Sequence, residues 1–186
     1  LEDRAAKAEV LEPKLNPLGK KIGVINIPSF YNNLTEDVKK EIASLKQQNV
    51  DGIIVDLRGN GGGSLPEAVT LTGLFIDKGP VVQIRDADGR VSAHRDNDGK
   101  TTYAGPLTVM VDRYSASASE IFAGAIQDYG RGVVMGTQSY GKGTVQRNVA
   151  FGKPLDSLGI QTEYGAVKLT FQKFYRITGS STQKKG

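Results

Sequence analysis

The chain has 186 residues, the size of one domain, and carries 24 basic and 20 acidic side chains for a net charge of +4. This mild positive excess is too small to indicate nucleic-acid binding, and no apolar run approaches the roughly 18 residues of a membrane-spanning helix. The absence of cysteine excludes thiol catalysis and cysteine metal sites, and the single histidine, His94, excludes multi-histidine metal sites. We therefore expect a globular domain that needs neither a metal nor a cofactor.

The first part of the chain alternates strand and helix patterns. Residues 1–19 are charged at first and then interrupted by proline and glycine, which predicts a connecting arm. A compact apolar run over 21–27 predicts a strand, and Thr35 is the expected N-cap of an amphipathic helix over 35–49. The run 52–57 lacks alternation, which is typical of a strand covered on both faces, as in a parallel sheet.

The middle of the chain adds a helix and an antiparallel part. A helix is expected over 66–75, because a proline fits the first helical turn. Apolar and polar residues alternate over 80–103, where Asp-Gly turns at 88–89 and 98–99 predict one or two hairpins. His94 lies among polar residues of this stretch, so we expect it at the surface.

The remainder of the chain continues the alternation. Buried strands are expected over 107–112 and 132–136, on either side of a helix over 115–129, and further strands over 145–151 and 167–177. Strands that alternate with helices and are buried on both faces predict an α/β fold with a small antiparallel part.

A glycine-rich loop, 56–63 (DLRGNGGG), comes directly after one buried strand and before a helix. Backbone N–H groups in such a loop can bind an anion or an oxyanion. Taken alone, however, the loop is better explained as a tight strand-to-helix turn, because glycine-rich turns are common at such junctions.

A second loop, 115–120 (SASASE), follows another buried strand and opens a helix. Ligand sites in α/β sheets lie at the carboxyl ends of strands, so a serine here is well placed as a nucleophile, with a helix N-terminal N–H beside it for an oxyanion. On spacing alone, Ser117 and Glu120 are better explained as a capping box. The residues by themselves do not choose among Ser115, Ser117 and Ser119.

A third loop, 136–144, nearly matches the phosphate-binding pattern G-x-x-x-x-G-K-[ST]. Gly143 stands where the Mg²⁺-binding serine or threonine belongs, and 145–149 favours a strand over the required helix, so nucleotide binding is the weaker hypothesis. Lys142, between two glycines, is alternatively a buried, neutral general base, since burial lowers the pKa of a lysine. A serine at a helix start, this lysine and glycine amides are together the parts of a Ser-Lys hydrolase, which needs neither histidine nor cysteine.

Seven short stretches, spread over essentially the whole chain, form a wider pattern: 1–5 (LEDRA), 27–31 (IPSFY), 56–63 (DLRGNGGG), 115–121 (SASASEI), 127–131 (QDYGR), 141–146 (GKGTVQ) and 172–176 (QKFYR). Together they closely resemble the peptidase core of the carboxyl-terminal processing peptidases. The resemblance implies an α/β core of the Clp protease/crotonase type, with a mixed, largely parallel sheet flanked by helices and a small antiparallel hairpin region.

The resemblance also implies a serine endopeptidase and assigns its site residues. The middle serine of the SASASE motif, Ser117, corresponds to the nucleophile, and Lys142 to the base. Gln146 corresponds to the glutamine that orients the lysine amine. Asp128 corresponds to an aspartate with a supporting role, although a structural ion pair with an arginine such as Arg131 explains it as well.

The oxyanion hole implied by the resemblance consists of the N–H of Ala118 and a second N–H from the glycine-rich loop. Gly62 and Gly63 are the favoured sources of that second group, and the register is open between them. Acyl transfer would follow, in which neutral Lys142 takes the proton of the serine hydroxyl as that hydroxyl attacks a peptide carbonyl.

Members of the family carry a PDZ module before this segment, which captures the C-terminus of the substrate and is missing here. We therefore expect 1–19 to be the arm that follows that module, 20–178 the peptidase core and 179–186 a polar tail. The resemblance implies unfolded or C-terminally tagged protein substrates, an adaptor protein, no nucleic acid, and a periplasmic location associated with the inner membrane. The alternative is a non-catalytic or latent peptide-binding core that needs its PDZ module for activity.

Overall fold

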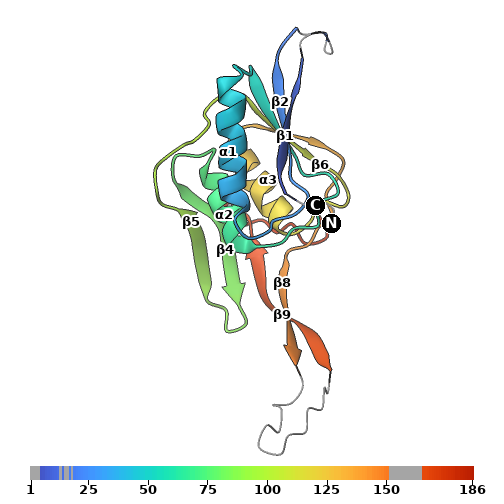
Figure 1. Cartoon of the computed structure of the whole chain (residues 1–186). Helices are drawn as coiled ribbons and strands as arrows, with labels where there is room; N and C mark the ends of the chain where they lie inside the picture. Colours follow the sequence, from blue (N-terminus) through green and yellow to red (C-terminus); the bar gives the residue numbers. More distant parts are fainter. Residues whose placement is uncertain (1–4, 13, 15–16, 18, 151–164) are drawn as a thin grey trace, which may run out of the picture.

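The computed structural model describes residues 5–12, 14, 17, 19–150 and 165–186, in which two sheets and three helices form (Figure 1). The first sheet has five strands in the order β1-β2-β3-β6-β7. Strands β2, β3, β6 and β7 are parallel, and β1 pairs with β2 in the antiparallel sense. The strand bounds are β1 Lys7–Leu11, β2 Ile22–Asn26, β3 Gly52–Asp56, β6 Leu107–Val111 and β7 Val133–Gly136.

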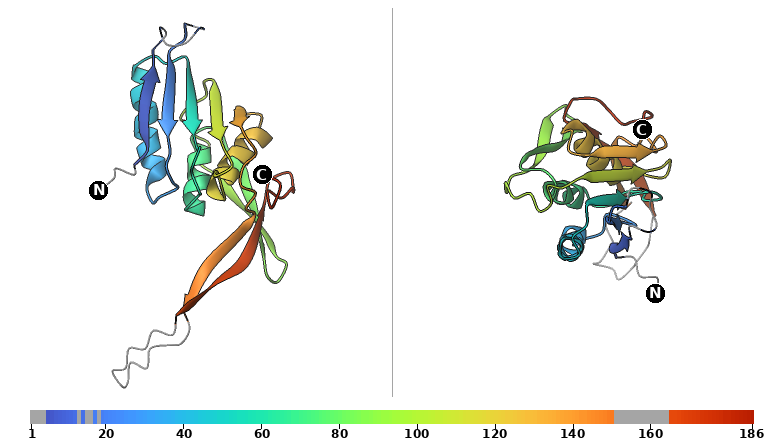
Figure 2. Two further views of the ribbon diagram at one scale, coloured as in Figure 1. Left: turned by 90° about the vertical axis from the view of Figure 1, so that its right-hand side faces the viewer. Right: turned by 90° about the horizontal axis from the view of Figure 1, so that it is seen from above.

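The three helices are α1 (Leu34–Gln47), α2 (Leu65–Gly73) and α3 (Ala118–Asp128), and they cover one face of the five-stranded sheet (Figure 2). The parallel strands are added in one direction across the sheet, so right-handed connections bring every helix to the same side. The buried side of α1 has the predicted helical spacing and consists of Leu34, Val38, Ile42 and Leu45. In the described part of the chain, no helix combines the length and the apolar character needed to cross a membrane.

The start of α1 differs from the prediction. The N-cap is Asn33, whose backbone adopts a φ of 72°, and not Thr35. Thr35 lies inside the first turn, where its backbone N–H and its hydroxyl donate to the Glu67 carboxylate at 2.9 and 2.7 Å. The hydroxyl therefore ties α1 to α2, a tertiary contact that a capping pattern does not reveal.

The second sheet is antiparallel and has four strands in the order β5-β4-β9-β8. Their bounds are β4 Gly79–Asp86, β5 Val91–Asp96, β8 Thr144–Ala150 and β9 Ala166–Tyr175. Strands β4 and β5 form a single hairpin around Asp88 and Gly89, and His94 is exposed on β5 as predicted. Strand β4 packs on α2 and α3, while β8 and β9 leave the body of the molecule as a twisted ribbon (Figures 1 and 2).

Two predictions about the first sheet were wrong. The expected arm contains strand β1, an edge strand whose side chains alternate between exposed and half-buried positions. The strand predicted as buried over 132–136 is β7, where Val133 is 59% and Met135 56% exposed because β7 is the opposite edge of the sheet. Parts of the predicted arm (1–4, 13, 15–16 and 18) and the last residue of the predicted strand 145–151 lie outside the described residues.

The predicted α/β architecture, a mixed sheet flanked by helices with a separate antiparallel part, is thus confirmed. Strands β3 and β6 are adjacent and parallel, in register from Ile53 opposite Leu107 to Asp56 opposite Met110. The glycine-rich loop that follows β3 and the serine-rich loop that follows β6 therefore leave the same edge of the sheet side by side.

Candidate active site

The two loops are joined by Asn60, which is fully buried (0% exposed). Its backbone carbonyl accepts hydrogen bonds from the Ala116 N–H at 3.0 Å and the Ser119 hydroxyl at 2.9 Å. Its side-chain amide donates to the Ile27 carbonyl at 2.8 Å, and Oδ1 accepts from the Gly62 N–H at 2.8 Å. Sequence reasoning did not single out Asn60, although the one amide within a run of glycines was a usable signal.

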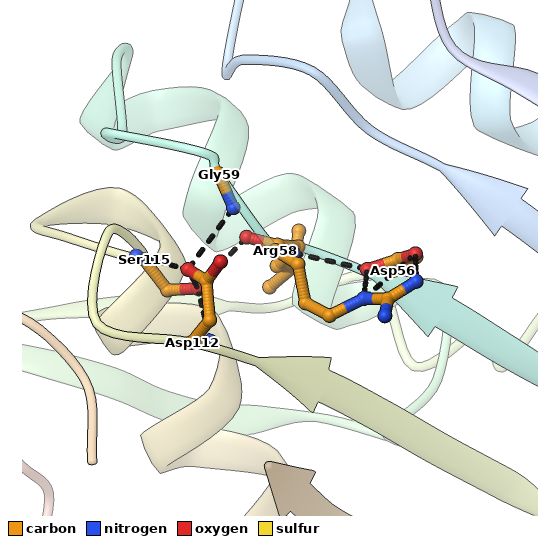
Figure 3. Close-up of polar contacts among 6 residues, drawn as sticks. Asp56, Arg58, Gly59, Asp112 and Ser115 are labelled. Atoms are coloured by element: carbon orange, nitrogen blue, oxygen red, sulfur yellow. Dashed lines mark hydrogen bonds and ion pairs between the residues drawn. The ribbon is translucent and has the colours of Figure 1, made fainter. Parts of the chain in front are cut away.

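Asp112 also joins these two loops, through Gly59 and Ser115 (Figure 3). Its Oδ1 accepts hydrogen bonds from the backbone N–H groups of Gly59 at 3.0 Å, Tyr114 at 2.9 Å and Ser115 at 3.1 Å. These bonds, the one from Gly59 above all, outweigh the effect of burial and hold the pKa of Asp112 below its usual value. An ionised carboxylate thus fixes the exit of β6 against the start of the glycine-rich loop.

Asp56, at the end of β3, is 7% exposed and pairs with Arg58 two residues on (Figure 3). The Arg58 backbone N–H donates to Oδ1 at 3.0 Å and its guanidinium Nη2 to Oδ2 at 2.7 Å. Burial acts to raise the pKa of Asp56, but the hydrogen bonds from Arg58 outweigh it and the pKa is lowered. The DLR part of the motif therefore shapes the turn itself.

The structure separates the three candidate serines. Ser115 and Ser119 are both 0% exposed, and their hydroxyls donate to the carbonyls of Leu57 at 2.8 Å and Asn60 at 2.9 Å. These two hydroxyls hold the loops together. Ser117 is only partly buried, which makes it the serine of the motif that a substrate can reach.

Ser117 also has an unusual backbone. With φ 58° and ψ −110°, it occupies a sparsely populated conformation that costs about 1–3 kcal/mol. It is the N-cap of α3, so the strain lies in a sharp strand-to-helix turn of the kind that presents nucleophilic serines. The loop from β3 reaches this turn closely, because a Cβ added at Gly62 would lie only 2.9 Å from the Ser117 Cβ.

Two backbone N–H groups beside Ser117 have no acceptor among the described residues, and they belong to Gly63 and Ala118. Gly62 is different, because its N–H is already bound to Asn60. Gly63 adopts a φ of 148° and lies against Phe30, whose carbonyl oxygen would collide with any Cβ at this position. Its contact with Phe30 thereby holds Gly63 with an unbonded N–H, directly after the glycine that lies against Ser117.

Glu120 connects Ser117 to the loop of Lys142. Glu120 is only 4% exposed, and its carboxylate accepts four hydrogen bonds. Oε2 accepts from the backbone N–H groups of Ser117 at 2.8 Å and Lys142 at 2.9 Å, and Oε1 accepts from the Gly141 N–H at 2.7 Å and the Ser139 hydroxyl at 2.8 Å. The sequence pattern explained this glutamate as half of a capping box, and the structure shows a second role, holding two distant loops together.

Lys142 is half-buried and lies between the end of β7 and the start of β8. Since the element after it is a strand and not a helix, the nucleotide-binding hypothesis for 136–144 was wrong. Within the described chain, no carboxylate pairs with the lysine amine, and no hydrogen bond joins that amine to the Ser117 hydroxyl. The backbones of the two residues are brought together, while their reacting atoms are not joined.

The other two predicted residues lie apart from this cluster. Gln146 is exposed on β8, and its side-chain amide donates to the Thr170 hydroxyl at 3.2 Å. Asp128 lies at the opposite end of α3 from Ser117, about 16 Å along the helix axis, and its carboxylate pairs with Arg176, whose Nε is 3.1 Å from Oδ2. The partner is therefore not Arg131, which instead donates to backbone carbonyls.

A strained serine at a strand-to-helix turn, with free amides beside it and a lysine loop held to it, is the arrangement of a serine hydrolase. The chain belongs to peptidase family S41, whose family model matches residues 21–186.

Individual relatives agree with this assignment. The chain is 54% identical over 188 residues to the tail-specific protease of Haemophilus influenzae, covering 100% of the chain and 26% of that protein. It is 42% identical over 118 residues to the chloroplastic carboxyl-terminal-processing peptidase 2 of Arabidopsis thaliana, covering 62% of the chain and 23% of that protein.

The fold is similar to the solved photosystem II D1 C-terminal processing protease, with a TM-score of 0.81 and 28% identity over 100% of this chain and 47% of that one. The resemblance expected from the sequence motifs is confirmed. The chain spans about a quarter of the length of the two curated relatives.

Proposed function

We propose that the chain is the catalytic core of a serine endopeptidase that uses Ser117 as its nucleophile and Lys142 as its general base. One observation carries the proposal: a single oxygen of Glu120 accepts the backbone N–H of both residues, at 2.8 and 2.9 Å. Residues 25 positions apart in the sequence are thereby anchored at one point, and a lysine side chain is long enough to reach a neighbouring hydroxyl from there.

In the proposed reaction, the neutral Lys142 amine accepts the proton of the Ser117 hydroxyl as Oγ attacks the peptide carbonyl carbon. The oxyanion is bound by the N–H groups of Ala118 and Gly63. The engagement of the Gly62 N–H with Asn60 supports Gly63 over Gly62. Lys142 then transfers its proton to the leaving amine, and water hydrolyses the acyl-enzyme with Lys142 again as the base.

Gln146 enters the proposal as the residue that orients the Lys142 amine. For that, its side chain must exchange the Thr170 hydroxyl for the amine. Among the described residues, no hydrogen bond joins the side chains of Ser117, Lys142 and Gln146. This favours a second candidate, a latent core in which the PDZ module of the parent chain completes the arrangement. Asp128 has a structural role in this proposal, because its carboxylate is bound by Arg176.

The substrates, partners and location follow from the relatives and stay proposals. Two relatives are named for tail specificity and for carboxyl-terminal processing, which supports substrates that are unfolded or carry a C-terminal tag. We propose that the PDZ module and an adaptor protein select such substrates. We also propose that the enzyme works in the periplasm, at the inner membrane.

Mass spectrometry of an unfolded protein substrate, incubated with the chain at mildly alkaline pH, tests the proposal. Ser117→Ala, Lys142→Ala and Lys142→Arg are compared with the unchanged chain, and Ser92→Ala, at an exposed position on β5, is the control. Lys142→Arg keeps the positive charge but cannot act as a base, because a guanidinium stays protonated. We expect fragments only from the unchanged chain and the Ser92→Ala variant.

Cleavage by the Ser117→Ala or Lys142→Arg variant at the rate of the unchanged chain would refute the proposed roles. If none of the proteins, including the unchanged chain, cleaves the substrate, the assay is repeated with the PDZ module fused in front of the chain. Cleavage that appears only then identifies the latent core.

A further inference from the structure

The backbone of the loop that carries Lys142 is completely hydrogen-bonded. Residues 141–143 contain three N–H and three C=O groups, and each of the six has a partner. Two N–H groups, those of Gly141 and Lys142, donate to Glu120, and the Gly143 carbonyl accepts from the Phe174 N–H at 3.0 Å. The partners of the loop in these three bonds, Glu120 and Phe174, belong to the predicted peptidase core.

The other three bonds come from residues 182–184, which the sequence predicted to be part of a polar tail. The contacts are Lys184 N–H to the Gly141 carbonyl at 2.7 Å, Thr182 Oγ1 to the Lys142 carbonyl at 3.3 Å, and Gly143 N–H to Gln183 Oε1 at 2.7 Å. Since two of the three use side chains, the identities of Thr182 and Gln183 matter for the loop.

The segment that makes these contacts is itself held in place. Thr182 is only 6% exposed, and its carbonyl accepts from the N–H groups of Lys185 at 2.9 Å and Gly186 at 3.0 Å. The Gln138 side chain donates to the Lys185 carbonyl at 2.6 Å. The approach is close, because a Cβ added at Gly143 would lie 3.0 Å from the backbone nitrogen of Gln183. The segment is therefore packed on the lysine loop.

We propose that Thr182 and Gln183 are positioning residues that hold Lys142 at the distance from Ser117 that proton transfer requires. The inference rests on the proposed role of Lys142 as the general base. A general base must come within about 2.6–3.2 Å of the proton donor, and a displacement of about 1 Å costs on the order of a hundredfold in rate. The lysine side chain is flexible, so its reach is set by where its backbone is anchored.

The test uses matched pairs of variants in the whole chain. Gln183→Ala removes the acceptor of the Gly143 N–H, and Gln183→Glu retains one. Thr182→Val removes the hydroxyl with little change of shape, and Thr182→Ser retains it. Ser92→Ala is the control, because Ser92 is exposed on β5, at the opposite edge of the second sheet from β8. The kinetic parameters kcat and KM are measured from neutral to alkaline pH, with an internally quenched peptide as substrate.

We expect kcat to fall about tenfold in Gln183→Ala and Thr182→Val, with KM unchanged, as for the loss of one hydrogen bond to a buried group. Thr182→Ser and Gln183→Glu should recover most of the loss. In Gln183→Glu the rise of kcat with pH should also move to higher pH, because the new carboxylate near Lys142 favours the charged amine. This shift reports that the side chain at 183 lies near the Lys142 amine, and the recovery of kcat by the conservative variants reports the positioning role.

The inference is overturned if Gln183→Ala and Thr182→Val keep the kcat of the unchanged chain, or if their losses are not recovered by Glu and Ser. Lys142→Ala separates this result from a failure of the proposed function. A Lys142→Ala variant that cuts normally refutes the base itself. If Lys142→Ala is inactive while the alanine and valine variants are normal, only the positioning role fails.

A second measurement does not need activity. Amide hydrogen exchange of Gly143, followed by nuclear magnetic resonance, should be at least about tenfold faster in Gln183→Ala than in the unchanged chain or in Ser92→Ala. Equal exchange rates in all three proteins would overturn the inference even if the core is latent.

Discussion

Replacing Glu120 by glutamine should destabilise the fold and separate the two proposed catalytic residues. The carboxylate accepts four hydrogen bonds in a site only 4% exposed, two on each oxygen. A glutamine has the same shape but only one accepting oxygen, so at least one backbone N–H, that of Gly141, loses its partner, while the Ser139 hydroxyl can turn to accept from the new amide. Hydrogen bonds to a charged group contribute about 1.5–3 kcal/mol each, which predicts a loss of at least about 1.5–3 kcal/mol in the free energy of unfolding.

That loss is a large fraction of the roughly 5–15 kcal/mol by which domains are stable, so urea unfolding followed by circular dichroism will resolve it. Glu36→Gln on α1 is the matched control, because that side chain is 65% exposed and its ion pair with Lys39 is long, at 4.0 Å. We expect the control to change stability by less than about 0.5 kcal/mol. A loss below about 1 kcal/mol for Glu120→Gln would refute the reasoning that this carboxylate holds the loops together.

Two further predictions concern the loops beside Ser117. Gly63→Ala should abolish cleavage and lower the melting temperature, because the new Cβ meets the Phe30 carbonyl at a φ of 148°; a variant with normal activity would show that the amide of Gly63 is not needed where we place it. The pKa of Asp112 is lowered in the folded state, so its contribution to stability is present above its usual value of 3.8 and is lost as pH falls through the lowered value. The difference in unfolding free energy between the unchanged chain and Asp112→Asn should therefore shrink in acid, and a difference that is constant with pH contradicts this.

Much of the fold follows from local patterns. Two elements were predicted from the spacing of their apolar residues, which indicates how an element is buried. They are α1, from the helical spacing of Val38, Ile42 and Leu45, and β3, from its unbroken apolar run. The wrong predictions concern the place of a strand within the sheet. Strand β7 has the apolar composition of a central strand but lies at an edge, and composition alone does not contain the strand order.

The site was predictable in its parts but not in its connections. The resemblance implied that the two loops meet, since it drew one oxyanion-hole N–H from each, and they do, through Asn60 and Asp112. From the sequence, only the family resemblance chose Ser117 among the three serines. The structure gives an independent reason for that choice, since the hydroxyls of Ser115 and Ser119 donate to backbone carbonyls. Burial and hydrogen-bond partners of this kind depend on contacts between distant residues, which no spacing rule encodes.

The glycines beside Lys142 show how one pattern supports two physical explanations. From the sequence, a lysine between two glycines was explained as a buried, neutral base. In the structure, a Cβ at Gly141 would lie 3.0 Å from the backbone nitrogen of Lys184, and one at Gly143 equally close to that of Gln183. A side chain at either position would meet another segment of backbone. That segment makes half of the hydrogen bonds of the loop. Polar residues such as Thr182 and Gln183 are typical of a solvent-exposed tail, yet they are also the residues that satisfy backbone groups, so composition alone could not distinguish the two.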